Sequence, residues 1–328
     1  MSFVSTTPHY NRYSFFLSSL IYPIIEHSVW NADGFLSPFS PTPYRGTGAV
    51  DFAGSGVVHL TGGVVSLVAI IILGPRKGRF YDEDGKVLPE AVTWPPHSVS
   101  LQMTGTLLLW FGWYGFNPGS TLRITPAGYG DVAALACVNT TLSAALGAIF
   151  GMFFDSLLGY FKTGQVSWDV GCCMNGALCA LASITGGCSV VDTWAAVVIG
   201  MVAGCIYVLA SKLLVRLRID DVVDAVPVHF FGGIWGLLST GLFAEPERLG
   251  KAYPIHDHQG WFYSWGKGSG DAHLLLNQVF LMLWIIGFAG ITMTLYFLAL
   301  KYLGLLRVNE VDEDVGLDIS VHKGSAYN

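Results

Sequence analysis

The stretch DFAGSGVVHLTGGVVSL, residues 51–67, has a counterpart in DVVDAVPVHFFGGIWGL, residues 221–237. Both read D-x7-H-x-x-G-G-x-x-x-L, so that His59 aligns with His229. Each histidine lies in a long apolar run beside a glycine pair, and small residues let another backbone approach closely. Ionisable side chains at membrane depth are costly and usually functional. The duplication therefore predicts a site shared by two structural repeats.

The composition indicates a membrane protein. The chain has 328 residues, of which 52% are hydrophobic and 12% charged, whereas a soluble domain carries about 25% charged residues. A membrane-spanning helix needs about 20 mostly apolar residues. We therefore expect an all-α, polytopic helical bundle with eight transmembrane helices, at residues 13–31, 48–74, 98–117, 129–158, 169–187, 190–215, 227–245 and 274–302. Residues 1–302 form the predicted membrane domain, and a polar tail follows over residues 303–328.

The positive charges predict how these helices are oriented. With the spans drawn above, twelve lysines and arginines fall on the side of the C-terminal tail and five on the other side. Cytoplasmic connections carry the excess of positive charge in membrane proteins. The tail is therefore predicted to be cytoplasmic.

The order of the spans predicts the symmetry of the repeat. The histidine helices are the second and seventh spans, and an odd offset makes them cross the membrane in opposite directions. The third to seventh spans form a five-helix unit that ends in a histidine helix, whereas the first histidine helix has one span before it. By this symmetry three N-terminal helices are missing, and we expect the chain to be a fragment or a shortened product.

The two histidines are predicted to line a pore. A neutral imidazole offers one N–H donor and one nitrogen acceptor, so a polar but uncharged solute, such as ammonia, could exchange hydrogen bonds along a row of them. A hydrated cation would lose its water there at a high cost. A hydrogen bond between helices is the ordinary role of a single membrane histidine, but two in equivalent positions favour the pore.

Two aspartates, Asp51 and Asp221, precede the histidines by eight residues each. Eight helical residues advance about 12 Å, so neither aspartate reaches its own histidine. Two interpretations stay open, because each carboxylate could cap a helix N-terminus or could support a cation at the pore entrance by its field.

The third span ends in FGWYGFNPGS, residues 111–120, where Trp113, Phe116 and Ser120 recur at helical spacing. Trp30 ends the first span on the same side. Aromatic residues at helix ends usually form an interfacial belt. An indole, a phenyl ring and a hydroxyl could instead recruit a small cation by cation–π attraction and a hydrogen bond.

Five segments together resemble the ammonium transporter family, most closely its plant and algal type. They are VDFAGSGVVHLTGG (50–63), LLLWFGWYGFNPGS (107–120), NGALCALASITGGCSVVDTWAA (175–196), DDVVDAVPVHFFGG (220–233) and GLDISVHKGSAYN (316–328). The resemblance implies an eleven-helix fold of two inverted five-helix repeats plus a last helix, matched here from the fourth helix onward. It implies ammonium or ammonia and the lipid bilayer as partners, a homotrimer or a heterotrimer with related subunits, and the plasma membrane as the location. No nucleic acid, cofactor or metal is expected.

The resemblance also assigns roles to residues by position. His59 and His229 resemble the twin pore histidines, and Phe116 one of two stacked gate phenylalanines. The other implied roles are the outer ammonium recruitment site for Trp30 and Ser120 with Trp113 nearby, the aspartate beneath that site for Asp51, acidic positions before the second histidine for Asp221 and Asp224, and a phosphorylatable tail position for Ser320. Phe230 stands where the family usually has a glycine, and we expect it to crowd the lumen.

The implied function is transport rather than catalysis. Ammonium would be recruited outside and deprotonated near the aromatic gate, and ammonia would pass the histidines. Potassium has no proton to lose and so keeps its charge at the dry lumen. The alternatives are a non-conducting ammonium sensor or regulatory subunit, or an inactive truncated fragment. A metalloenzyme is disfavoured, because the eight-residue offset keeps each aspartate from its histidine.

Overall fold

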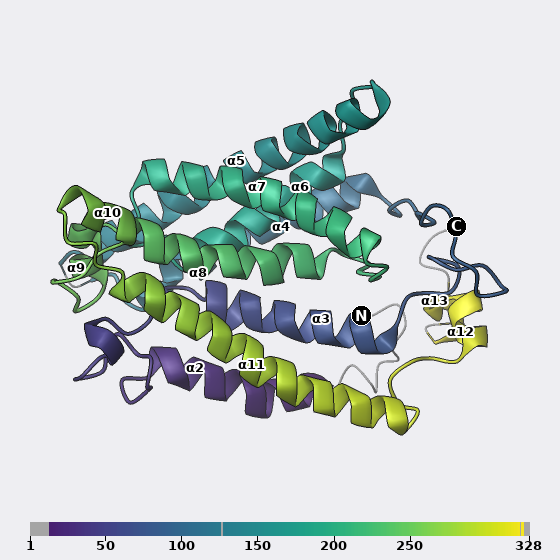
Figure 1. Cartoon of the computed structure of the whole chain (residues 1–328), viewed down its shortest axis with the longest axis horizontal. Coiled ribbons are helices and arrows are strands. Elements are labelled where there is room, and N and C mark those ends of the chain that lie inside the picture. Colours follow the sequence, from purple (N-terminus) through teal and green to yellow (C-terminus); the bar gives the residue numbers. More distant parts are fainter. Residues whose placement is uncertain (1–12, 126, 322, 325–328) are drawn as a thin grey trace.

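The computed structural model describes residues 13–125, 127–321 and 323–324 (Figure 1). The start of the predicted membrane domain (residues 1–12), residues 126 and 322, and the end of the predicted tail (residues 325–328) lie outside this range. Within the described residues the regular elements are helices, together with two isolated β-bridges. The all-α class predicted from the sequence is confirmed.

Each of the eight predicted membrane segments contains a helix. Five helical stretches are long and apolar enough to cross a membrane: Ser55–Leu73 (η3 and α3), Tyr129–Thr163 (α5), Thr193–Arg216 (α7), Val226–Phe243 (η5 and α8) and His273–Tyr302 (α11). The other three positions hold shorter or less apolar helices: Leu17–Ile21 with Tyr22–Trp30 (η1 and α2), Val99–Phe116 (α4) and Val170–Ile184 (α6). The predicted positions are thus helical, whereas length and composition alone mark five of them as spans.

Short helices occupy the two ends of the bundle. The long helices lie along the long axis in Figure 1, with α9 (Pro246–Ala252) and α10 (Trp261–Gly266) at one end. At the opposite end α12 (Glu310–Val315) and α13 (Leu317–Ser320) lie beside the connection that follows α3. Two 3-10 turns complete the set, η2 (Tyr44–Gly46) and η4 (Pro118–Thr121).

Local sequence sets several helix boundaries. The Ser98 hydroxyl accepts a hydrogen bond from the backbone N–H of Leu101 at the start of α4, and Asp169 accepts one from Gly171 at the start of α6. Both are preferred N-cap residues. Gly164 ends α5 in the left-handed conformation that favours glycine. These signals fix where α4 and α6 begin and where α5 ends.

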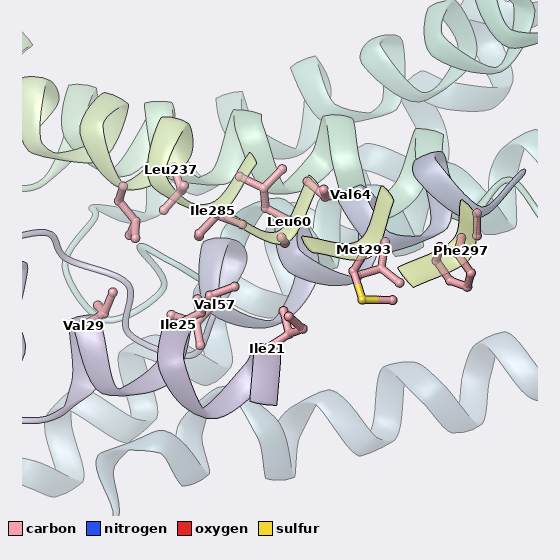
Figure 2. Packing of buried hydrophobic residues seen from close by; sticks show 14 of the residues in the cluster. Ile21, Ile25, Val29, Val57, Leu60, Val64, Leu237, Ile285, Met293 and Phe297 are labelled. Atoms are coloured by element: carbon pink, nitrogen blue, oxygen red, sulfur yellow. The ribbon is translucent and has the colours of Figure 1, made fainter. Parts of the chain in front are cut away.

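One apolar cluster joins α2, α3, α8 and α11 (Figure 2). Its members recur every fourth residue, so each helix presents one buried stripe. Those of η1 and α2 are Ile21, Ile25 and Val29, and those of α11 are Leu281, Ile285, Ala289, Met293 and Phe297. All eight are fully buried. In a membrane such contacts stabilise mainly by dispersion and close fit, so the first helix and α11 are held firmly against the first histidine helix.

A second packing unit joins α5, α6 and α7 through glycine. A Cβ atom added at Gly176 would lie 2.5 Å from the carbonyl oxygen of Gly147, and one added at Gly204 would lie equally close to the same atom. The three backbones therefore touch at this level, as is usual for small residues at membrane helix contacts.

Candidate functional site

Both histidine helices begin with a π-helical turn. In the first copy this turn is η3 (Ser55–Leu60), which carries His59 and continues as α3 (Thr61–Leu73). In the second copy it is η5 (Val226–Phe231), which carries His229 and continues as α8 (Gly232–Phe243). π-helical turns are rare and are frequent at functional sites. The sequence repeat is therefore also a repeat of unusual backbone geometry.

The two copies are packed through the second glycine of each pair. A Cβ atom added at Gly63 would lie 2.3 Å from the backbone nitrogen of Phe230, and one added at Gly233 would lie 2.8 Å from that of Leu60. Phe230 and Leu60 occupy equivalent positions, one residue after each histidine. The contact is therefore reciprocal. The later residue of the first helix, Gly63, meets the earlier residue of the second, Phe230, whereas the earlier Leu60 meets the later Gly233. The predicted antiparallel relation of the two copies holds at this crossing, and α3 and α8 run in opposite directions in Figure 1.

The crossing brings the two histidines into direct contact. Nδ1 of His59 lies 3.2 Å from Nδ1 of His229, a hydrogen bond in which one ring donates and the other accepts. The rings are stacked at 5.2 Å between centroids and 11° between planes. Because one nitrogen must accept, the two rings cannot both be protonated at Nδ1 while this bond exists. The buried Nε2 of His59 has no hydrogen-bond partner among the described residues, so it is free to interact with a solute.

Two aromatic residues of α4 cover His59. The ring of Trp113 is stacked on it at 5.5 Å between centroids and 18° between planes, and the ring of Phe116 lies 5.9 Å away. The indole Nε1 of Trp113 donates a hydrogen bond of 3.1 Å to the hydroxyl of Thr185. Trp113 therefore lies deeper than the resemblance implied, against the histidine pair.

The other residues implied for recruitment lie together at one end of the bundle. Trp30 and Ser120 line a cavity of about 600 Å³ with Glu26, Phe52 and Tyr253. The Ser120 hydroxyl donates to the backbone carbonyl of Phe116, one helical turn earlier. This cavity joins an indole, further aromatic rings, a hydroxyl and a carboxylate, which attract a small cation, with the guanidinium of Arg123, which repels it.

Both aspartates of the repeat cap the π-helical turn that follows them. Oδ2 of Asp51 accepts hydrogen bonds from the backbone N–H groups of Gly56 and Val57, at 2.9 and 2.8 Å. Oδ2 of Asp221 accepts one from Val226 at 2.7 Å. The capping interpretation left open by the sequence is therefore observed in both copies.

Asp224 lies at the other end of the bundle. Its carboxylate accepts hydrogen bonds from the hydroxyls of Tyr207 at 2.7 Å and Ser211 at 3.1 Å. Burial raises the pKa of Asp224, although these hydrogen bonds act in the opposite direction. Asp224 and Tyr207 line a second cavity, of about 950 Å³. Of the implied site residues, Asp224 thus lines this cavity, whereas Trp30 and Ser120 line the other.

Phe230 packs among apolar side chains. It contacts the cluster between α2, α3, α8 and α11 and a smaller cluster that includes Ile70, Leu214 and Val226. Its ring also lies edge-on to that of Phe231, at 5.2 Å between centroids. These contacts account for the side chain, and the crowding of the lumen stays a prediction.

An ion pair between the two histidine helices was not predicted from the sequence. The guanidinium of Arg76, after α3, donates to both carboxylate oxygens of Asp220, before η5, at 2.7 and 2.8 Å. Burial alone would raise the pKa of Asp220, but the hydrogen bonds and charge of Arg76, helped by Arg79, hold it below its usual value. The residues are 144 positions apart, so no local sequence pattern could have found this contact.

The predicted tail is docked onto the connection after α3. Arg307 donates to both carboxylate oxygens of Glu313, and Glu313 also accepts from the backbone N–H of Lys77 at 2.9 Å. The ammonium group of Lys77 lies 2.8 Å from Asp314. Ser320 ends α13 with its hydroxyl oxygen buried, so a kinase would reach it after the tail had moved.

Comparison with known proteins identifies the family of this chain. The sequence profile of the Ammonium Transporter Family matches residues 6–327. Ammonium transporter 1 member 1 of Oryza sativa subsp. japonica is 41% identical, over 97% of this chain and 63% of its own length. Ammonium transporter 1 member 1 of Arabidopsis thaliana is 40% identical, over 97% of this chain and 62% of its own length. The chain therefore spans slightly less than two thirds of these relatives.

Solved structures share the fold. A protein described as a sensor Amt protein superposes with a TM-score of 0.77 at 29% identity, over 98% of this chain and 71% of its own. Candida albicans Mep2 superposes with a TM-score of 0.76 at 28% identity, over 94% of this chain and 61% of its own. With the profile match over nearly its whole length, the chain belongs to the ammonium transporter family.

Proposed function

We propose that this chain transports ammonium or ammonia across a membrane, along a path that passes His59 and His229. The observation that carries the proposal is the buried Nδ1–Nδ1 contact of 3.2 Å between these rings at the crossing of two inverted copies. Because that hydrogen bond occupies both Nδ1 atoms, the Nε2 atoms are left for a solute. The relatives' names support the substrate, since both plant proteins are ammonium transporters.

Recruitment is proposed for the cavity that contains Trp30 and Ser120. Aromatic faces attract a small cation, and the Ser120 oxygen can accept a hydrogen bond from it. The carboxylate of Glu26 in the same cavity adds negative charge. An ammonium ion would be held there by interactions that partly replace its water.

Deprotonation is proposed to precede passage of the histidines. Phe116 and Trp113 surround His59 with apolar surface, where a charged ion is costly. Ammonia without charge avoids this cost and exchanges hydrogen bonds with the imidazoles. Potassium cannot shed its charge, so the same surface excludes it.

The oligomeric state and the location of this chain are proposed by analogy with the family. We propose a trimer, a plasma-membrane location and a cytoplasmic tail over residues 303–328. The exposed leucines of α4 and the apolar outer face of α11 give such an assembly surfaces that lipid or another subunit would cover.

The test is uptake of labelled methylammonium by yeast cells that lack their own ammonium transporters. Cells expressing this chain are expected to exceed the empty-vector rate. His59→Ala and His229→Ala are each expected to lower that excess by about tenfold or more, because each leaves the other ring without its hydrogen-bond partner. His27→Ala, at an exposed histidine on α2, is the matched control and should keep the original rate. Equal uptake by all three variants would refute the role of the pair.

A sensor or regulatory subunit is the second candidate, favoured by the likeness to the sensor Amt protein. It predicts ammonium binding at the Trp30 cavity without transport. Binding in detergent, measured calorimetrically, together with uptake equal to empty vector, would favour this candidate over the transporter.

A further inference from the structure

We propose that His258, Asp271 and His273 form a binding site for a divalent transition-metal ion of the zinc class. The site lies at the start of α11, at the end of the bundle that holds α9 and α10 (Figure 1). It is separate from the histidine pair and does not depend on the proposed transport function.

The three side chains converge from two segments. Nδ1 of His258 lies 2.7 Å from Oδ2 of Asp271, and Nδ1 of His273 lies 3.7 Å from Oδ1 of the same carboxylate. The imidazole rings are 5.2 Å apart between centroids. One ligand atom from each residue lies within 4.8 Å of the other two. A single ion could therefore contact all three groups.

The donor set suits zinc. Two imidazoles and a carboxylate, with a fourth position left for water, is a ligand set that Zn²⁺ commonly takes. At bond lengths near 2.0 Å, tetrahedral ligand atoms are about 3.3 Å apart. The present separations lie on either side of this value, at 2.7 Å from Nδ1 of His258 to Oδ2 of Asp271 and 3.7 Å from Nδ1 of His273 to Oδ1.

The neighbouring groups orient the Asp271 carboxylate, and the site is open to solvent on one side. Oδ1 of Asp271 accepts a hydrogen bond of 2.9 Å from the backbone N–H of His273, which orients it. The side chains of His258 and Asp271 are 20% and 18% exposed, whereas that of His273 is 52% exposed. An ion can therefore arrive from solvent on the His273 side and bind the nitrogen lone pair of a neutral imidazole.

A second group of possible metal ligands is less suited to hold an ion. Asp155, Asp169 and Cys172 also lie within reach of one another. However, Lys212 already lies 2.7 Å from Asp155, and Asp169 caps α6. A metal ion there would compete with a bound cation and a helix cap.

Metal binding would brace the segment that leads to the first histidine helix. One turn after His273, the amide of Asn277 donates to Tyr44, Thr47 and Gly48. The next residue, Gln278, exchanges two hydrogen bonds with the backbone of Val50, directly before Asp51. An ion that fixes the start of α11 to the connection before α10 therefore also steadies the residues that position His59.

The experiment measures zinc bound per chain and the melting temperature of the full chain purified in detergent. After zinc addition and gel filtration, about one bound zinc ion per chain and a higher melting temperature are expected. Cobalt added in place of zinc should give the visible absorption of a four- or five-coordinate ion. Zinc-independent melting and no retained metal would mean that the three residues form an ion pair and helix cap only, which would overturn the proposal.

Variants connect the binding to these residues. His258→Ala and His273→Ala should each weaken zinc binding by about 100-fold or more, because loss of an outer partner alone costs 10–100-fold. Asp271→Asn keeps an oxygen acceptor for the N–H of His273 and should weaken zinc binding without unfolding the chain. His256→Ala, at an exposed histidine two residues from His258, is the matched control. Equal loss in His256→Ala, or none in the other three, would place the metal elsewhere.

Discussion

The indole Nε1 of Trp30 donates a hydrogen bond of 2.7 Å to the backbone carbonyl of Asp51. The carboxylate of Asp51 in turn holds the N–H groups of Gly56 and Val57 at the start of the π-helical turn that carries His59. Trp30 and the turn that carries the first histidine are therefore joined by two consecutive polar contacts through one buried aspartate.

Asp51→Ala is expected to destabilise the chain by about 1–3 kcal/mol, because two backbone donors lose a charged acceptor inside the protein. Asp221→Ala removes one such bond and should cost about half as much. Denaturant unfolding in detergent, followed by intrinsic fluorescence, measures both. Equal midpoints for Asp51→Ala and the parent chain would show that the cap contributes nothing.

The reciprocal glycine contact predicts a sharp difference within the first glycine pair, Gly62 and Gly63. Gly63→Ala places a Cβ atom 2.3 Å from the nitrogen of Phe230, and overpacking of this kind costs about 1–3 kcal/mol or more. Gly233→Ala should behave alike. Gly62→Ala has nothing within 4 Å of the added atom and should be neutral or slightly stabilising, since alanine favours helix. Thermal unfolding compares the three, and a destabilised Gly62→Ala would contradict the geometry.

The ion pair of Asp220 with Arg76 predicts a pH dependence. The pKa of Asp220 is lowered in the folded chain, so its contribution is full above the unfolded value of about 4 and is lost as the pH falls below it. Asp220→Asn should destabilise by about 1–3 kcal/mol at pH 7, less than a fully buried pair because Arg76 is partly exposed. The difference from the parent chain should shrink as the pH falls below about 4.

The control for this pH series is Asp84→Asn, at an exposed residue of the connection after α3 that also carries Arg76. Its unfolding midpoint should follow that of the parent chain at every pH. A pH-independent effect of Asp220→Asn would indicate a packing role instead of an ion pair.

Trp113 is predicted to act through the apolar surface that its ring presents to His59. Trp113→Phe keeps an aromatic ring against the imidazole but removes the hydrogen bond to Thr185, and Trp113→Ala removes both. Methylammonium uptake should fall by less than about tenfold for phenylalanine and by more for alanine, since one hydrogen bond is worth about 1 kcal/mol. Thr185→Val isolates the hydrogen bond and should match Trp113→Phe.

The docked tail is predicted to depend on Arg307 rather than on Lys77. Arg307→Ala removes the paired contacts with Glu313 and a contact to the carbonyl of Leu73, and should speed hydrogen exchange across residues 303–324. Lys77→Ala removes an exposed ion pair, which contributes little to docking because solvent screens it. Exchange mass spectrometry would contradict the assignment if Lys77→Ala released the tail more than Arg307→Ala.

Much of the architecture followed from periodic features of the sequence. Apolar runs predicted helices at all eight positions, and the repeated motif predicted the meeting of His59 with His229, since inverted copies cross where their glycines allow it. The sequence did not show that Gly63 makes this contact while Gly62 faces open space. Which face of a helix meets its neighbour depends on the whole bundle.

The parts that were missed depend on distant or irregular contacts. The π-helical turns have no known local signal in this chain, and Trp113 was expected beside Trp30 because spacing along α4 does not give depth. Asp220 meets Arg76, and His258 meets Asp271, across connections whose path the sequence leaves undetermined. Helix identity is a local property, whereas these partners are chosen by tertiary packing.

The pairing of identical atoms at the crossing also bears on directionality. The two rings meet through identical Nδ1 atoms, and which of them donates depends on the tautomer, so the contact itself has no fixed polarity. A centre of this kind cannot rectify flow by itself, and under the proposed function reversing the gradient would reverse the current through it. Any preference for one direction of transport must arise beside the histidine contact, where Trp113 and Phe116 cover His59.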